Sequence, residues 1–319
     1  MKLKSITVTI AGAALLAGCS LGDSAPSDVE AGSLAEGSDL KGASFTVGGK
    51  EFTEQLVLCE ITAQALESAS ATVDRSCGMS GSSSVRSALE SGDIDLYWEY
   101  TGTGWLTHLA ETEIINDAEA LYTKVDEADS AKNGIDWLAP APANNTYAVA
   151  LATETADELG LATLSDYAEL AKTDPEQASF CGAAEFFGRD DGWDGLQEAY
   201  GFKVEGERVS ELAAGAIYSS IDKGSPCVTG EIFATDGRVA ALGLTVLEDD
   251  KQFFPVYNPS VSINSDVLKD NPDIEQVLGP IADALDDETL QALNGRVDVD
   301  GETPEQVAED WLIEQGFAK

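Results

Sequence analysis

The stretch WEYTGTGW, residues 98–105, places three aromatic rings and a carboxylate around a Thr-Gly-Thr-Gly segment. Large rings usually belong to the core of a protein, whereas Gly and Thr at this density mark a loop. Glycine lets the backbone of such a loop come close to another group. The composition of this stretch therefore favours a binding loop, and the other elements of the chain must show what it surrounds.

Residue types that carry out catalysis are scarce or unpatterned in this sequence. There is one histidine, His108, and we find no Ser/His/Asp or Cys/His triad and no Walker-type phosphate loop. Carboxylates are numerous, but no spacing singles out a pair for general acid–base work. The wide cysteine spacings and the single histidine disfavour a zinc site. We therefore expect a binding protein that is no enzyme and that uses neither a metal nor a cofactor.

The charge balance narrows the choice of partners. The 18 basic and 58 acidic residues give a formal net charge of −40. Nucleic acid and anionic lipid both need Lys and Arg, so neither is an expected partner through charge. A charge of this size keeps a protein soluble and repels its own copies.

The N-terminus resembles an export signal. Lys2 and Lys4 precede an apolar run, and Leu-Ala-Gly-Cys at 16–19 is similar to the lipobox of bacterial lipoproteins. We expect a signal peptide over residues 1–18 and lipidation of Cys19, the alternative being an ordinary cleaved signal with a chance cysteine. Residues 19–42 are rich in Ser, Gly, Ala and acidic residues, which predicts a flexible tether on the outer face of the cell membrane.

Strand and helix patterns alternate after residue 43. Strands are expected over 44–49, 71–77 and 94–100, with helices over 53–68, 82–92 and 114–131. This order predicts a mostly parallel α/β sheet covered by helices. A similar alternation over 147–236 and the chain length favour two lobes. Ligands of such sheets bind beyond the carboxyl ends of the strands, where residues 98–105 lie.

Four cysteines remain besides Cys19, which suggests two disulfides in an exported protein. Three pairings are open, and free buried thiols are the alternative. We favour Cys59–Cys77 and Cys181–Cys227 because each pair then lies within one lobe. A bridge between the lobes would lock any hinge.

Six segments together resemble one known family, the substrate-binding proteins of ABC importers for glycine betaine, choline and related quaternary amines. The resemblance covers the chain after the tether, and the segments occur in the family's order. They are GGKEFTEQ (48–55), SGDIDLYWEYTGTGW (91–105), NNTYAVA (144–150), EFFGRDDGW (185–193), FATDGR (233–238) and FFPVYNP (253–259).

The resemblance implies a two-lobed type II periplasmic-binding-protein fold with the ligand in the cleft between the lobes. We expect lobe 1 to comprise 43–145 and 237–319, and lobe 2 to comprise 146–236. The implied role is capture of glycine betaine outside the membrane and delivery to a permease with its ATPase subunit. Choline, carnitine or another small solute are alternatives, and a surface lipoprotein without a transport role is a further one.

The resemblance also implies roles for eight residues. Tyr100, Tyr147, Phe233 and Tyr257 match the aromatic cage; Lys50, Thr103 and Arg189 match groups that hold a carboxylate; and Asn145 matches a polar cage position. A quaternary ammonium has no N–H to donate, so ring faces suit it, whereas a buried carboxylate needs Arg or Lys.

Each of these roles has a structural alternative. Phe233 stands where the family usually has tyrosine, so the ring face is kept and a hydroxyl is lost. Arg189 could instead pair with a neighbouring carboxylate, and Asn145 could only shape a turn. Trp98 and Trp105 are expected to pack in the interior, and Glu99 to bond to backbone or to a neighbour.

Overall fold

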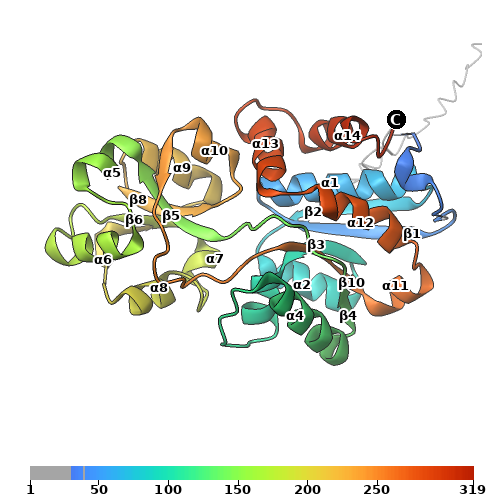
Figure 1. The fold of residues 1–319 in the computed structure, drawn as a ribbon, viewed down its shortest axis with the longest axis horizontal. Helices are drawn as coiled ribbons and strands as arrows, with labels where there is room; N and C mark the ends of the chain where they lie inside the picture. Colours follow the sequence, from blue (N-terminus) through green and yellow to red (C-terminus); the bar gives the residue numbers. More distant parts are fainter. Residues whose placement is uncertain (1–29, 39) are drawn as a thin grey trace, which may run out of the picture.

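The computed structural model describes residues 30–38 and 40–319. The chain forms two halves, each built on a five-stranded sheet, and it crosses between them twice (Figure 1). The first half holds the sheet β2-β1-β3-β10-β4, and the second half holds β7-β6-β8-β5-β9. The strands of the first half are β1 Ser44–Lys50, β2 Thr72–Met79, β3 Leu96–Tyr100, β4 Ile135–Trp137 and β10 Pro259–Asn264. Those of the second are β5 Tyr147–Ala152, β6 Phe180–Gly182, β7 Val209–Glu211, β8 Thr229–Phe233 and β9 Leu244–Val246.

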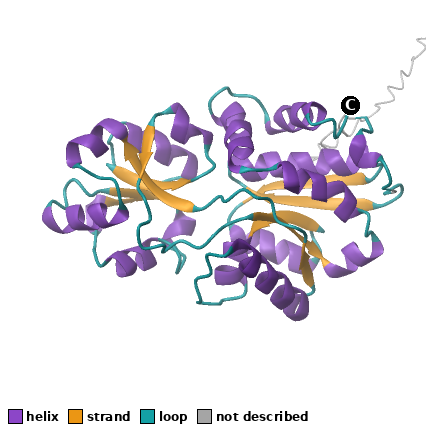
Figure 2. Cartoon of the chain, viewed as in Figure 1, coloured by secondary structure: helices purple, strands orange, loops and turns teal. Residues whose placement is uncertain are grey.

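Helices cover both faces of each sheet (Figure 2). In the first half, α1 Thr53–Ser68 and α12 Ile274–Ala284 lie on one face, and α2 Ser82–Ser91 and α4 Ala118–Asn133 on the other (Figure 1). The remaining helices of this half are α3 Thr101–Thr103, α11 Ser265–Asp270, α13 Asp287–Asp298 and α14 Pro304–Glu314. Those of the second half are α5 Thr153–Leu159, α6 Leu164–Thr173, α7 Ala184–Phe187, α8 Trp193–Tyr200, α9 Ala214–Asp222 and α10 Gly237–Ala241. No helix within the described ranges is both long and apolar enough to cross a membrane.

Strand β3 shows why the sheet is fully buried. Leu96 and Trp98 pack with α1 and α12 on one face, whereas Tyr97 packs with α2 and α4 on the other. Successive side chains of a strand point to opposite faces, so a sheet covered on both faces needs apolar residues at every position. The segment LYWEY is buried at every position, and its polar atoms have partners: Glu99 accepts from the Tyr97 hydroxyl, and the Trp98 indole N–H donates to Thr62.

Strand directions differ from the mostly parallel sheet that the alternation predicts. Pairs β1–β2, β1–β3, β6–β7 and β6–β8 are parallel. The pairs that β5 and β10 make with their neighbours are antiparallel. These are the strands that follow the two crossings, so the chain enters each sheet from the other half and runs in the opposite direction.

The boundary between the halves also needs correction. Residues 237–319 were expected to lie in the first lobe, but β9 pairs with β5 in the second sheet. The second crossing therefore runs from residue 247 to 258, between β9 and β10. The three-residue strand β9 is too short to leave a periodic signal in the sequence.

The predicted tether ends earlier than expected. Leu34 and Leu40 are buried in the core of the first half, and the amide of Glu30 donates to the carbonyl oxygen of Lys319 at 3.0 Å. Residues 30–38 and 40–42 are therefore part of the fold. The predicted signal peptide and Cys19 lie outside the described residues.

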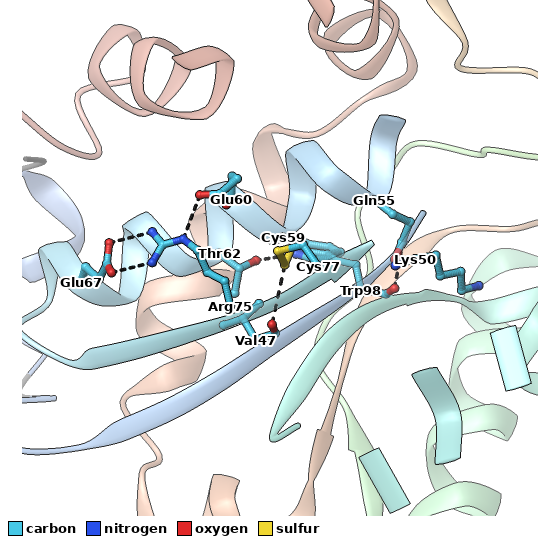
Figure 3. Close-up of a disulfide and its surroundings, with 10 residues drawn as sticks. All are labelled: Val47, Lys50, Gln55, Cys59, Glu60, Thr62, Glu67, Arg75, Cys77 and Trp98. Carbon is cyan, nitrogen blue, oxygen red and sulfur yellow. Dashed lines mark hydrogen bonds and ion pairs between the residues drawn. A yellow bond between two sulfur atoms is a disulfide. The ribbon is translucent and has the colours of Figure 1, made fainter. Parts of the chain in front are cut away.

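Both favoured disulfides are confirmed. Cys59 on α1 is bonded to Cys77 on β2, and Cys181 on β6 is bonded to Cys227 just before β8. Each bridge lies within one half. Close to the first bridge, Arg75 on β2 forms ion pairs with Glu60 and Glu67 on α1 (Figure 3). The helix and the edge strand are thus held together by a covalent bond and by charge.

Candidate ligand-binding site

The segment at 98–105 is not the loop that its composition favours: it is the end of β3, followed by α3 and a helical turn over Gly104–His108. It packs against rings of its own chain. A Cβ added to Gly102 would lie 2.7 Å from the ring of Tyr257, and one added to Gly104 would lie 2.6 Å from the ring of Trp137. Real Cβ atoms do not approach other atoms so closely, so both glycines are needed for contact. Tyr257 comes from the second crossing, so Gly102 sets the position of an expected cage ring.

The two tryptophans of the segment 98–105 pack in the interior, as the sequence predicts. Trp98 is buried, and its indole N–H donates to the Thr62 hydroxyl at 2.7 Å. Trp105 is also buried, and its indole N–H donates to the carbonyl oxygen of Glu113. Neither lines the cavity described next.

A cavity of about 390 Å³ lies between the two halves. All eight residues for which the resemblance implies a role line it. They come from β1, β3, α3, both crossings, β5, β8 and the segment after α7. Residues far apart in the sequence therefore converge on one partly open cavity at the sheet edges.

Aromatic rings form one wall of this cavity. The ring centre of Tyr147 lies 5.3 Å from that of Phe233 and 5.6 Å from that of Tyr257. The rings of Tyr147 and Tyr257 meet edge to face. Phe52 adds a ring that the sequence analysis missed, since it stacks on Phe233 at 5.0 Å and faces Tyr100 at 6.2 Å. Its position two residues after Lys50 in the GGKEF segment was the only signal.

Two cage hydroxyls are fixed by carboxylates. Tyr100 donates to Glu54 at 2.8 Å, and Tyr257 donates to Asp191. Burial, reinforced by these carboxylates, raises the pKa of both phenols well above its usual value. The hydroxyls therefore stay neutral donors and hold their rings in place.

Lys50 lines the cavity but is already paired. Its ammonium group forms an ion pair with Glu99, which also accepts hydrogen bonds from the Tyr97 hydroxyl at 2.8 Å and the Tyr100 amide at 2.9 Å. Burial alone would raise the pKa of Glu99, but the Lys50 charge and a contact with His108 hold it well below its usual range. Glu99 therefore remains ionised and largely neutralises Lys50.

Arg189 is held by short bonds on one edge and by longer ones on the other. Its Nε donates to Asp191 at 2.7 Å and Nη2 donates to the other oxygen of that carboxylate. Its Nη1 makes only long contacts, 3.4 Å to the Thr103 hydroxyl and 3.3 Å to Glu185. Pairing with Asp191 thus orients the guanidinium and leaves the Nη1 edge beside the cavity.

Two carboxyl groups from the second half also border the cavity. Glu231 on β8 is buried and accepts a hydrogen bond from the Ala183 amide at 2.7 Å. Burial raises its pKa to about 8. Glu185 instead accepts from the Ser82 amide at 3.0 Å and from the Ser82 hydroxyl, and these bonds with the Lys50 charge hold its pKa below its usual range against the effect of burial.

The contact between Glu185 and Ser82 joins the two halves. The N-cap residue of α2 is Gly81, and no serine of the SSS run that begins this helix caps it. Glu185 of the second half caps it from across the cavity. An N-terminal carboxylate is favourable there because the first amides of a helix lack partners.

The residues that line the cavity supply groups for binding a small molecule. Among residues 30–38 and 40–319, no cluster of three or more His, Cys, Asp or Glu side chains could hold a metal ion. The lining offers aromatic faces, the Arg189 guanidinium and the buried carboxyl group of Glu231. It can enclose a small molecule with both cationic and anionic parts.

Comparison with known proteins shows which family this chain resembles in sequence. Residues 43–314 match the family model for the substrate-binding domain of the ABC-type glycine betaine transport system. The glycine-betaine-binding protein of Pseudomonas aeruginosa is 38% identical over 276 residues, covering 85% of this chain and 88% of that protein. The glycine betaine-binding protein YehZ of Escherichia coli is 35% identical over 280 residues, covering 86% and 91%.

The fold agrees with the same assignment. The apo structure of YehZ from Escherichia coli is similar with a TM-score of 0.64 at 33% identity, covering 86% of this chain and 99% of that one. The expected two-lobed α/β fold of type II periplasmic binding proteins is therefore confirmed. The chain belongs to the family of substrate-binding domains of ABC-type glycine betaine transport systems, whose members bind a solute and are not enzymes.

Proposed function

We propose that this protein captures glycine betaine, or a closely related quaternary ammonium compound, in the cavity between its halves. The observation that carries the proposal is the convergence of Tyr100, Tyr147, Phe233 and Tyr257 with the Nη1 edge of Arg189 on one space. Ring faces attract a trimethylammonium head at about 0.5–2 kcal/mol for each cation–π contact. The guanidinium edge supplies a partner for the carboxylate at the other end.

Of the three groups that the resemblance implies for the ligand's carboxylate, Arg189 and Thr103 are the better placed. Arg189 Nη1 and the Thr103 hydroxyl lie together beside the cavity, and they can donate to the same anion. Lys50 is committed to Glu99, so its contribution is a partly cancelled positive charge behind Tyr100. Asn145 lies at the rim with its amide donating to Glu54, which leaves its carbonyl oxygen, buried and without a hydrogen-bond partner, next to the cage.

Binding is expected to favour the state in which the halves touch. Tyr100 and Thr103 come from the first half, and Tyr147, Phe233 and Arg189 come from the second. A ligand that contacts both halves stabilises their closed arrangement by its differential affinity. The closed form is then the one presented to the permease, whose ATPase subunit drives transport.

The test is calorimetric titration of the purified protein with glycine betaine and with choline. Tight binding of glycine betaine and weak binding of choline would support an aromatic cage with a carboxylate partner. Equal binding of both would retain the cage and remove Arg189 from the account. Carnitine is titrated as a third ligand, and binding of carnitine alone would replace glycine betaine as the proposed ligand. No binding of any of the three compounds would overturn the proposal.

We further propose that the protein works on the extracytoplasmic face, held there by a lipid on Cys19. The basic start, the apolar run and the Leu-Ala-Gly-Cys segment at 16–19 support this. Changing Cys19→Ser should release the protein from the membrane fraction of expressing cells. Equal membrane association of Cys19→Ser and the parent protein would contradict the lipid anchor.

A further inference from the structure

Glu54 lies directly behind the cage, on the first turn of α1, and is only 3% exposed. Its Oε1 accepts hydrogen bonds from the Tyr100 hydroxyl at 2.8 Å and from Asn145 Nδ2 at 2.9 Å. Its Oε2 accepts from Asn294 Nδ2 at 3.0 Å and from the Thr235 hydroxyl. Each carboxylate oxygen therefore has two donors.

These four donors fit the ionised form of the carboxylate. An ionised carboxylate has about four acceptor positions and no proton, and here every position is occupied by a donor. Asn294 Nδ2 also donates to the carbonyl oxygen of Thr235, which fixes the direction of that amide. Burial holds the pKa of Glu54 above its usual value, and the four hydrogen bonds limit that rise without cancelling it.

The charge on Glu54 has no basic partner. Within the described residues its side chain forms no ion pair, and its four partners are neutral. The other cage hydroxyl differs, because Tyr257 donates to Asp191 and that carboxylate is paired with Arg189. Tyr100 is therefore the cage tyrosine that is hydrogen-bonded to an unpaired carboxylate.

The same four bonds reach three of the four cage rings. Tyr100 is bonded directly, Asn145 lies two residues before Tyr147, and Thr235 lies two residues after Phe233. These segments come from the first half, from the first crossing and from the second half. A carboxylate at their junction fixes the rings relative to each other, and it concentrates negative charge where water is excluded.

We propose that Glu54 is a positioning residue whose unpaired charge gives the cage its preference for a permanent cation over a neutral group of the same shape. The negative charge attracts a trimethylammonium head directly, and through its hydrogen bond it makes the Tyr100 ring a stronger cation acceptor. A cage of rings alone would also bind a neutral tert-butyl group by apolar burial. This inference rests on the proposed function.

Two ligands of equal shape separate charge from fit. Glycine betaine and tert-butylacetate differ in that carbon replaces the cationic nitrogen, while the carboxylate end is the same. For wild type and for Glu54→Gln, calorimetry gives the affinity ratio of the two ligands. We expect Glu54→Gln to weaken glycine betaine by about tenfold or more while tert-butylacetate changes by less than about threefold. The affinity for glycine betaine relative to tert-butylacetate should therefore be at least about threefold lower in Glu54→Gln than in wild type.

Matched variants distinguish charge from structure. Thr235→Val removes one of the four hydrogen bonds and keeps the charge, so it should weaken both ligands by a similar factor. Glu60→Gln makes the same substitution further along α1, where the carboxylate pairs with Arg75 outside the cavity, and should leave the ratio unchanged. If Glu54→Gln does not fold, Tyr100→Phe breaks the hydrogen bond while keeping the ring, and it should lower the ratio in part.

The outcomes are separable from those of the proposed function. An unchanged ratio in Glu54→Gln, or in Tyr100→Phe when the first variant does not fold, would overturn the role of Glu54 while leaving betaine binding intact. Equal weakening of both ligands would make Glu54 a purely structural residue and would also overturn it. Failure of the wild-type protein to bind glycine betaine would remove the proposed function and this inference together.

Discussion

The two halves of this molecule share one plan and use it differently. In each sheet the outer parallel strands are followed by an antiparallel strand that enters from the other half. Each half also brings to the cavity one basic residue paired with a carboxylate, Lys50 with Glu99 and Arg189 with Asp191. Each contributes one buried carboxyl without a basic partner as well, Glu54 in the first and Glu231 in the second.

The difference between the halves lies in how these groups are held. Glu54 accepts four side-chain hydrogen bonds, whereas the one hydrogen bond recorded for Glu231 within the described residues comes from the Ala183 amide. The Lys50 ammonium is neutralised within the wall, whereas Arg189 Nη1 makes only long contacts. The buried acids and the basic residues therefore differ between the halves, although both halves contribute cage rings: Tyr100 comes from the first, and Tyr147 and Phe233 come from the second.

The largest expected difference concerns Glu231. Its pKa is raised from 4.5 to about 8, chiefly by burial, with the Glu185 charge adding and Arg189 opposing. The folded protein keeps a proton that the unfolded chain releases, so this contribution is full below pH 4.5 and is lost as pH rises through 8. It is on the order of 5 kcal/mol of unfolding free energy.

Thermal unfolding across this pH range should therefore show a smaller fall in stability for Glu231→Gln than for wild type. The Gln variant keeps the size of the side chain and cannot ionise. Parallel stability curves for the two proteins would show that Glu231 does not carry its proton into the fold, and the contrast with Glu54 would disappear.

The next effect separates the two basic residues. We expect Arg189→Gln to weaken glycine betaine by about thirtyfold or more, since losing a buried charged hydrogen-bond partner costs roughly 2 kcal/mol or more. Choline, which lacks the carboxylate, should change little. Lys50→Gln should have a smaller effect on glycine betaine, because Glu99 already neutralises the ammonium. An equal loss in the two variants would place the ligand carboxylate between Lys50 and Arg189.

The cage rings of the two halves give a third contrast. Tyr100→Ala should weaken glycine betaine by at least about tenfold, which corresponds to about 1.4 kcal/mol. Phe233→Ala should weaken it less, because Phe233 has no hydroxyl connecting it to Glu54 and Phe52 stacks on it from behind. Calorimetric titration of both variants with glycine betaine measures which ring contributes more to binding. Unchanged affinity in Tyr100→Ala would remove the aromatic cage from the account.

The smallest expected difference is between the two disulfides. The bridges span 18 and 46 residues of sequence. In the chain-entropy description, the longer loop constrains the unfolded chain more, by about 1 kcal/mol. Replacing Cys181 and Cys227 by Ala should therefore lower the unfolding free energy more than replacing Cys59 and Cys77, as measured by urea denaturation. The reverse order would show that local packing of α1 on β2 outweighs loop length.

The sequence anticipated the groups that face the cavity better than the connections between them. Tyr100, Tyr147, Phe233, Tyr257 and Arg189 each occur in a short segment whose pattern is visible along the chain. The alternation of strands and helices also revealed two units, and with them the disulfide pairing. The roles of these residues came from the resemblance of those segments to the family, and the local strand and helix patterns placed them near the ends of strands.

The strand directions and the partners of Glu54 and Lys50 could not be predicted, because they depend on contacts between segments that are distant in the sequence. The directions of β5 and β10 follow from the crossings, and β9 is too short to show a period. Glu54 reads as an ordinary first-turn acid of α1 until Thr235 and Asn294 meet it from positions far along the chain. Likewise, the commitment of Lys50 to Glu99 is a contact between neighbouring strands that no residue spacing indicates.

The packing of the first described residues against the last ones has a mechanical consequence. Ala31 pairs with Ala318, so the first and the last described residues lie together on the first half (Figure 1). A pulling force applied at residue 30 would therefore act on the first half directly, without passing through either crossing. The second half would feel such a force only through its contacts with the first half, such as the hydrogen bonds between Glu185 and Ser82.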